Sequence, residues 1–397
     1  MKNFILNMET KIHFGTEMLD TIGESVKAYT NGPILITSGG GSIKRSGIYD
    51  KVTSILDASG IEYLELDGIK PNPEVDTARA GIKMIKENNI DFILALGGGS
   101  VLDNSKHMAV GAACESDVWD IITNKNEHPI IDSKIPNIGT VITVAATGSE
   151  MNSGGVMTNP EFDLKLGYGN PLLAPKFTYE DPTVLETLPE YHKRAGLCDI
   201  LSHLCENYFG SHTDDGIDDR LVEAIMKNTI AHGDNYISSN NYEDLANIFW
   251  SSTLALNGLT RLSRPGSDWF AHTLEHEISA FTDLTHGIGL AIVQPKLLEL
   301  YYHKDLKEGN SLIKFENLGV NVFEFNRTDA DLAAKTVKAL NEVFARFGGV
   351  VYLEDVEIAQ GVLDNDLIAN RAADSNGSCY YKLSLDETKQ LIANLYK

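Results

Sequence analysis

The sequence is poor in cysteine, in basic residues and in long apolar runs, and each shortage excludes a class of protein. It has four cysteines in 397 residues, and no two of them form a Cys-x-x-Cys pair. A disulfide scaffold or a zinc ribbon is therefore not expected. No run of about 18 consecutive apolar residues occurs, so we predict no membrane-spanning helix.

Acidic residues outnumber basic ones, 56 Asp and Glu against 33 Lys and Arg, and the net charge is −23. The phosphates of a nucleic acid demand a basic surface, so we predict no nucleic-acid partner. The opening residues, MKNFILNMETK, lack the basic region, long apolar core and small-residue cleavage site of a signal peptide. We therefore expect a cytoplasmic protein.

The order of strand-like and helix-like segments changes near residue 180. Before it, apolar β-prone runs over 33–37, 63–66, 92–96 and 138–144 alternate with helical patterns, which is typical of a parallel α/β sheet. After it, we expect only helices, over 221–230, 242–262, 269–280, 289–302 and 329–347. Because 397 residues are too many for one ordinary core, we predict an α/β domain over 1–182 and an all-helical domain over 183–397.

The helical part contains side chains able to bind one divalent metal. Asp199 and His203 are four residues apart on one expected helix, so they lie on the same face, and His272 and His276 do likewise on another. His286 follows, with Gly287 after it, in what we interpret as a loop folding back. A carboxylate with imidazoles suits Zn²⁺ or Fe²⁺. Taken singly, each histidine could equally be an ordinary core or surface residue.

A glycine turn follows the expected strand at 92–96. Gly97, Gly98, Gly99 and Ser100 lie between that strand and a helical pattern, and Asp103 falls in the first helical turn. Backbone N–H groups at a helix N-terminus lack helical partners, and glycine lets a diphosphate approach them. The turn indicates a dinucleotide site in the first domain, with the active site in the cleft between the two domains. It is not the G-x-G-x-x-G fingerprint, and such turns also occur without a ligand.

A second glycine run follows the expected strand at 33–37, where a doubly wound sheet receives the adenosine half of a dinucleotide. No Asp or Glu stands at this strand end to bind a ribose 2′-hydroxyl, whereas polar and basic residues there could hold a 2′-phosphate. We therefore favour NADP(H) over NAD(H). The residues are Gly39, Gly40, Gly41, Ser42, Lys44 and Arg45.

A third loop follows the expected strand at 138–144 and contains Thr147 and Ser149. Small residues with hydroxyl groups suit a loop that lines a cofactor, although a plain turn would have the same composition. Large aromatic residues at Trp119, Trp269 and Phe270 are candidate walls of a substrate pocket, or core residues.

Five stretches of the sequence resemble the motifs of the group III, iron-containing alcohol dehydrogenases. In chain order they are TSGGGSIKRSG, LGGGSVLDNSK, ATGSEMNSG, DILSHLCE and DWFAHTLEHEISAFTDLTHGIG. The resemblance covers nearly the whole chain. It implies the dehydroquinate synthase-like architecture of that family, an α/β dinucleotide-binding domain followed by an all-α metal-binding domain.

The resemblance also implies roles for individual residues. The metal ligands would be Asp199, His203, His272 and His286, binding Fe²⁺ or possibly Zn²⁺, and His276 would be a candidate proton relay. The metal would polarise an aldehyde carbonyl while NADP(H), or else NAD(H), exchanges a hydride. Residues reaching the cofactor would be Gly97, Gly98, Gly99, Ser100, Asp103, Thr147, Ser149 and Lys165.

For the substrate, the resemblance implies short-chain primary alcohols and aldehydes, butanol and butanal first, and a homodimer as the assembly. A methylglyoxal or lactaldehyde reductase and a glycerol dehydrogenase are alternatives within the enzymes. A different class is a non-redox lyase resembling 3-dehydroquinate synthase, which needs several basic residues beside the metal helices. The available ones are Lys193, Arg194, Arg261 and Arg264.

Overall fold

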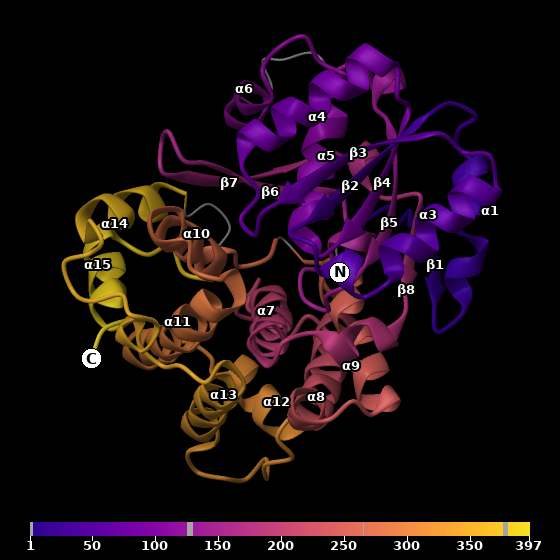
Figure 1. The fold of residues 1–397 in the computed structure, drawn as a ribbon. Coiled ribbons are helices and arrows are strands. Elements are labelled where there is room, and N and C mark those ends of the chain that lie inside the picture. Colours follow the sequence, from indigo (N-terminus) through magenta and orange to yellow (C-terminus); the bar gives the residue numbers. More distant parts are fainter. Residues whose placement is uncertain (1–2, 125–129, 265, 376–379) are drawn as a thin grey trace. The chain divides into compact units, whose positions relative to one another are not determined.

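The structure, a computed structural model, describes residues 3–124, 130–264, 266–375 and 380–397 (Figure 1). Contacts between residues divide the chain into two compact units. One is Asn7–Pro189, and the other is Glu190–Lys397 together with the amino-terminal segment up to Leu6. The predicted domain boundary between residues 182 and 183 stays a prediction. Cys379 lies outside the described residues.

The first unit is built on a six-stranded sheet in which every described pair of neighbours is parallel. This confirms the predicted α/β fold. Side chains alternate between its faces: Ile34 and Ile36 enter one apolar core, and Leu35 enters the other. The strands, in spatial order, are β1 (Lys11–Phe14), β8 (Phe177–Glu180), β5 (Asn137–Ile142), β4 (Phe92–Gly97), β2 (Ile34–Gly39) and β3 (Tyr63–Ile69).

Helices cover both faces of this sheet (Figure 1). One core contains residues of α4 (Val75–Asn88), α5 (Gly99–Ala112) and α6 (Val118–Thr123), and it includes Trp119. The other contains residues of α1 (Ile22–Lys27) and α3 (Ile48–Ala58). Shorter elements are α2 (Ser42–Arg45) and the 3-10 turns η1 (Met18–Thr21), η2 (Asp132–Lys134), η3 (Ser149–Met151), η4 (Pro171–Leu173) and η5 (Pro182–Thr187).

An antiparallel hairpin, β6 (Gly154–Asn159) and β7 (Leu164–Gly169), is a feature that the sequence analysis missed. Strand β6 packs on α5. As a result α5 is buried on almost all sides, including its polar residues Asp103, Lys106 and His107. The hairpin therefore turns a surface helix into a core helix.

The second unit is helical, and its described residues form no strand. A helix was predicted over 242–262, but α9 ends at Leu256 because Gly258 takes a left-handed conformation with φ of 95°. No described helix is long and apolar enough to cross a membrane. The helices are α7 (Glu190–Tyr208), α8 (Ile217–Ser238), α9 (Tyr242–Leu256), α10 (Phe270–Thr282), α11 (His286–Glu308), α12 (Ile313–Asn321), α13 (Leu332–Gly348), α14 (Asn365–Asp374) and α15 (Leu385–Ala393), with 3-10 turns η6 (Leu259–Arg261) and η7 (Leu353–Val356).

Candidate metal centre and dinucleotide-binding loops

The four predicted metal ligands come together in the second unit around one carboxylate oxygen. Oδ1 of Asp199 lies 3.6 Å from Nε2 of His203 and 3.7 Å from Nε2 of both His272 and His286. Two ligands bound at ordinary distances to a tetrahedral cation are ~3.3–3.6 Å apart. The distances from Oδ1 to the three nitrogens therefore suit a small divalent cation, and the ligand atoms of Asp199, His272 and His286 all lie within 4.8 Å of one another. One carboxylate oxygen with three imidazole nitrogens suits Fe²⁺ or Zn²⁺.

Two of the donor atoms at this centre are buried without a hydrogen bond within the described parts of the chain. Among the described residues, Oδ1 of Asp199 and Nε2 of His272 are buried and have no hydrogen-bond partner. The rings of His203 and His272 stack with centroids 4.7 Å apart. Trp269 stands edge-on to both of these rings. Buried polar atoms are normally bonded, so atoms left in this state are what a cation site requires.

Two glutamates stand behind the histidines. Oε2 of Glu206 lies 2.5 Å from Nδ1 of His272, and Oε1 of the same carboxylate accepts a hydrogen bond from the backbone N–H of His272. The carboxylate of Glu275 contacts Nδ1 of His286. A carboxylate in this position fixes the ring orientation and tautomer of a metal-binding histidine and directs its Nε2 at the metal.

The charges of the centre are strongly coupled. Burial alone would raise the pKa of Asp199, but the imidazoles of His203, His286 and His272 hold it well below its usual range. Burial lowers the pKa of His203 to about 3, which keeps that ring neutral. Burial also opposes charge on His272, yet Glu206 and Asp199 raise its pKa to about 10. The carboxylates of Glu206 and Asp199 thus favour positive charge on His272.

A close helix contact brings His286 to Asp199. His286 is the first residue of α11, with Thr285 before it as the N-cap, so our interpretation of His286 as a loop residue was wrong. A Cβ atom on Gly287 would lie 2.0 Å from the carbonyl oxygen of Ala195 on α7. Only glycine allows the start of α11 to approach α7 this closely.

His276, the candidate proton relay, is half-buried beside two of the ligands. Its ring centroid lies 6.1 Å from that of His272 and 5.2 Å from that of His286. Glu275, His276 and His286 form a second group with metal-ligating atoms within 4.8 Å of one another. Because His286 directs Nδ1 at Glu275 and Nε2 at Asp199, we interpret this second group as support for the first centre.

In the first unit, the glycine turn lies at the start of α5. Gly98 is the N-cap, and the backbone N–H groups of Val101 and Leu102 bond to its carbonyl. A Cβ atom on Gly99 would lie 2.4 Å from Oγ1 of Thr147. The structure therefore brings the first and third predicted cofactor loops into direct contact.

The other predicted cofactor residues near α5 are largely internal. Asp103 accepts hydrogen bonds from Oγ of Ser149 at 2.6 Å and from the backbone N–H of Val156 at 2.9 Å. Lys165, on β7, is 6% exposed. Their contacts to a cofactor stay a prediction, as does that of Ser100.

The second glycine run ends β2 and leads into α2. Ser42, Lys44 and Arg45 are exposed, as the prediction of a phosphate site requires. Asp67 of β3 lies beside them, with a carboxylate oxygen 3.1 Å from Nζ of Lys44. The premise that no acidic residue stands at this edge was therefore wrong, because the neighbouring strand supplies one.

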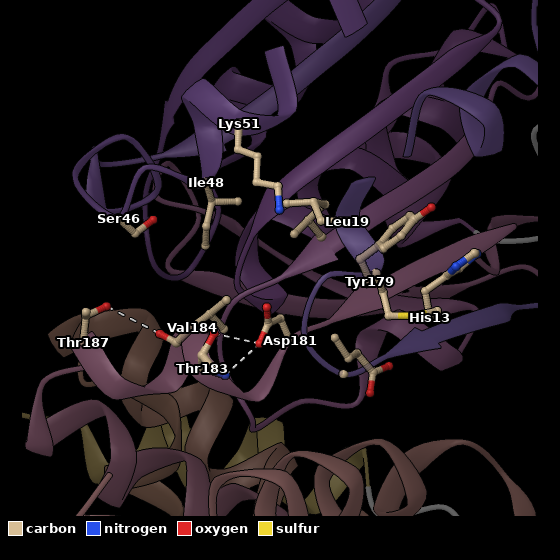
Figure 2. Close-up of a pocket in the computed structure, with 14 residues that line it drawn as sticks. His13, Leu19, Ser46, Ile48, Lys51, Tyr179, Asp181, Thr183, Val184 and Thr187 are labelled. Atoms are coloured by element: carbon tan, nitrogen blue, oxygen red, sulfur yellow. Dashed lines mark hydrogen bonds between the residues drawn. The ribbon is translucent and has the colours of Figure 1, made fainter. Parts of the chain in front are cut away.

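A cavity of about 160 Å³ opens near the carboxyl ends of β5 and β8 (Figure 2). Leu19, Ile48 and Val184 give it apolar walls, and Lys51 reaches toward it from α3. The predicted cofactor residues do not line it. Parallel α/β sheets bind their ligands at the carboxyl ends of the strands, so the cavity lies at the expected edge.

Two family models together match most of the chain. The model described as iron-containing alcohol dehydrogenase matches residues 9–182, and the C-terminal model of the Fe-containing alcohol dehydrogenase family matches residues 194–397. The chain belongs to the iron-containing alcohol dehydrogenase family. This confirms the resemblance drawn from the motifs.

Members of this family resemble the chain over nearly its whole length. It is 38% identical to the NADH-dependent butanol dehydrogenase A of Clostridium acetobutylicum over 95% of this chain and 94% of that one. It is 34% identical to the NADPH-dependent aldehyde reductase YqhD of Escherichia coli over 89% of each. The crystal structure of the NADH-dependent butanol dehydrogenase A of Thermotoga maritima matches with a TM-score of 0.91 and 32% identity, covering 100% of this chain and 99% of that one.

Membership of the iron-containing alcohol dehydrogenases makes this chain an NAD(P)-dependent oxidoreductase with a metal. The relatives name different cofactors, NADH and NADPH, so they leave the cofactor preference open. Two of the four basic residues that a non-redox lyase would need are engaged elsewhere, whereas Arg261 lies over the ring of Trp269, beside the candidate ligands. Arg264 is fully buried against Asp219, and Arg194 binds Glu190.

The sequence analysis missed Glu206, Glu275 and a buried lysine, Lys106. Glu206 follows His203 by three residues and Glu275 follows His272 by three. That spacing places each glutamate one helical turn from a predicted ligand, so helical periodicity could have found both. Lys106 gave no such signal, because distant segments, the loop at 149–152 and the hairpin after it, enclose its side chain.

Proposed function

We propose that this chain is a metal-dependent alcohol dehydrogenase and aldehyde reductase that prefers NADP(H) and acts on short-chain primary alcohols and aldehydes, with butanol and butanal first. The observation that carries the proposal is the arrangement of three imidazole nitrogens around Oδ1 of Asp199 at 3.6–3.7 Å. Asp199, His203, His272 and His286 would hold Fe²⁺, with Zn²⁺ as the alternative. Such a cation, when bound, makes a carbonyl carbon more electrophilic, and the nicotinamide supplies the hydride.

The protein's own residues would orient the reactants and move the proton. His276 lies beside His272 and His286, and we assign it the transfer of a proton to the product oxygen. Trp269 stands edge-on to two ligand rings and would form an apolar wall that keeps water away from the reacting carbon. Glu206 and Glu275 would keep the histidines aligned.

The preference for NADP(H) is supported by the exposed Lys44 and Arg45 on α2, which follows β2. NAD(H) is the second candidate, and Asp67 is the observation that favours it, because a carboxylate at this edge can accept hydrogen bonds from a ribose. A homodimer and a cytoplasmic location stay predictions.

The test is NADPH oxidation with butanal by protein that was reloaded with Fe²⁺ without oxygen, beside a chelator-treated control. We expect oxidation that the chelator abolishes. His203→Ala should lose both the metal and the activity, and His303→Ala, which changes an exposed histidine, should lose neither. Protein that is shown to hold metal but oxidises neither NADPH nor NADH with butanal would refute the proposed reaction.

A further inference from the structure

Lys106 of α5 is completely buried and binds a single segment of chain. Its Nζ lies 2.7–3.0 Å from five oxygens: the carbonyl and hydroxyl of Ser149, the carbonyl and side-chain oxygens of Asn152, and the carbonyl of Gly154. An ammonium group has three protons to donate, so five oxygens at these distances give each proton an acceptor. The segment 149–154 joins the third cofactor loop to β6.

Asp103 holds the same segment from one helical turn earlier. The hydroxyl of Ser149 donates to Oδ1 of Asp103 at 2.6 Å and accepts from Nζ of Lys106 at 2.8 Å. Oδ2 of Asp103 accepts the backbone N–H of Val156 at 2.9 Å. We call Asp103, Lys106 and Ser149 the α5 clamp. Its two charges are buried together and compensate one another, and neither can leave without exposing the other to a low dielectric.

The clamp sets the position of the loop beside the glycine turn. Thr147 precedes the clamped Ser149 by two residues, and its Oγ1 accepts the backbone N–H of Ser149 at 3.2 Å. The same Oγ1 occupies the space that a side chain at Gly99 would need. The loop and the turn are therefore packed against each other, and a shift of segment 149–154 would move Thr147 away from the start of α5.

We propose that Lys106 is a positioning residue for the dinucleotide: it acts through Ser149 and segment 149–154 to hold Thr147 against the turn at 97–99. Lys106 does not touch the cofactor, because its donors are used by the five loop oxygens. The proposal rests on the proposed function, since it assigns the residue that shapes the cofactor site of that reaction.

The experiment compares Lys106→Met with the wild type and with Lys314→Met. Lys314 is the matched control, because it is also fully buried but binds Asp219 in the helical unit. The fluorescence of the bound cofactor gives the dissociation constants of NADPH and NADH. Steady-state rates give the KM values of the cofactor and of butanal. Circular dichroism gives the melting temperature.

We expect Lys106→Met to raise the cofactor Kd and KM by about tenfold to a hundredfold, since small displacements of binding groups have effects of this size. The KM of butanal and the metal content should stay at the wild-type values. Lys314→Met should lower the melting temperature but leave the cofactor Kd unchanged. Asn152→Ala, which removes one of the five oxygens, should raise the cofactor Kd in the same direction and keeps the test available if Lys106→Met does not fold.

The outcomes separate the two proposals. A wild type that oxidises NADPH, with a Lys106→Met or Asn152→Ala variant that binds cofactor as tightly as the wild type, overturns the positioning role alone. A rise in the cofactor Kd that Lys314→Met reproduces also overturns it, because the effect would then follow from lost stability. A wild type that binds neither nucleotide overturns both proposals.

Discussion

Nζ of Lys44 on α2 lies 3.1 Å from a carboxylate oxygen of Asp67 on β3, and the two side chains are 42% and 65% exposed. Such an exposed ion pair contributes little to stability. Its interest lies in its position, since Lys44 can bind a 2′-phosphate and Asp67 can bind a ribose hydroxyl. A residue that would favour NADP(H) and a residue that would favour NAD(H) therefore lie side by side.

Lys44→Ala should weaken NADPH binding about tenfold, because one charged contact to phosphate contributes about 1.5 kcal/mol or more. NADH binding should not change. Asp67→Asn should tighten NADPH binding by freeing Lys44 and removing a repelling charge. The Kd values follow from cofactor fluorescence, with Lys83→Ala, in an exposed pair on α4, as the control. Equal weakening of both cofactors by Lys44→Ala would contradict the assignment of a 2′-phosphate site.

Glu206→Gln and Glu275→Gln should each lower metal affinity about tenfold to a hundredfold, because the ligand histidines lose the carboxylates that orient them. The measurement is a titration of bound metal against a competing chelator. Glu277→Gln is the control, since Glu277 is also buried on α10 but binds Arg371. If all three variants hold metal equally well, the two glutamates do not support the centre.

Asp268→Asn should stabilise the protein more at pH 8 than at pH 5. Burial and the charge of Glu206 raise the pKa of Asp268 to about 7. Between about pH 4 and pH 7 the folded state therefore keeps a proton on Asp268 that the unfolded chain has released. The wild type loses stability as the pH rises through this range. Asparagine removes this loss and can still accept the backbone N–H of Phe270.

The check on Asp268 is the melting temperature as a function of pH, with a rise of about 2–4 °C for each kcal/mol regained. Asp117→Asn should have the opposite sign and lower the melting temperature at pH 8, because a hydrogen bond from Arg79 lowers the pKa of Asp117. An Asp268→Asn effect that is the same at both pH values would show that Asp268 does not titrate as described.

Gly287→Ala should destabilise the helical unit by about 1–3 kcal/mol, the usual cost of overpacking, because the new Cβ meets the carbonyl of Ala195 at 2.0 Å. It should also lower metal affinity, since His286 is the adjacent residue. Denaturant unfolding and metal titration measure the two effects. Gly32→Ala, where the new Cβ would lie 3.7 Å from Oγ1 of Thr30, should leave both unchanged. Normal metal binding by Gly287→Ala would mean that this contact does not position His286.

Much of the fold could be predicted because its signals are local. The run Phe92–Gly97 is apolar and β-prone and ends in glycine, and the observed strand matches the expected one to within a residue. The helices that carry Asp199 and His272 were recognisable from the four-residue spacing of polar side chains on one face. The four-residue strands β1 and β8 and the β6–β7 hairpin were missed, because short segments carry too little periodicity to stand out.

The sequence by itself determined the order of strands and helices, the glycine turns and the set of side chains available for a metal, because these depend on neighbours within a few residues. Only the tertiary structure decided which groups meet. It placed Glu206 behind His272, Asp67 beside Lys44, and the segment that begins at Ser149 around Lys106. Each of these contacts joins residues at least 23 positions apart in the chain. Such contacts depend on how closely two elements pack, as they do at Gly99 against Thr147 and at Gly287 against Ala195, where a side chain would not fit.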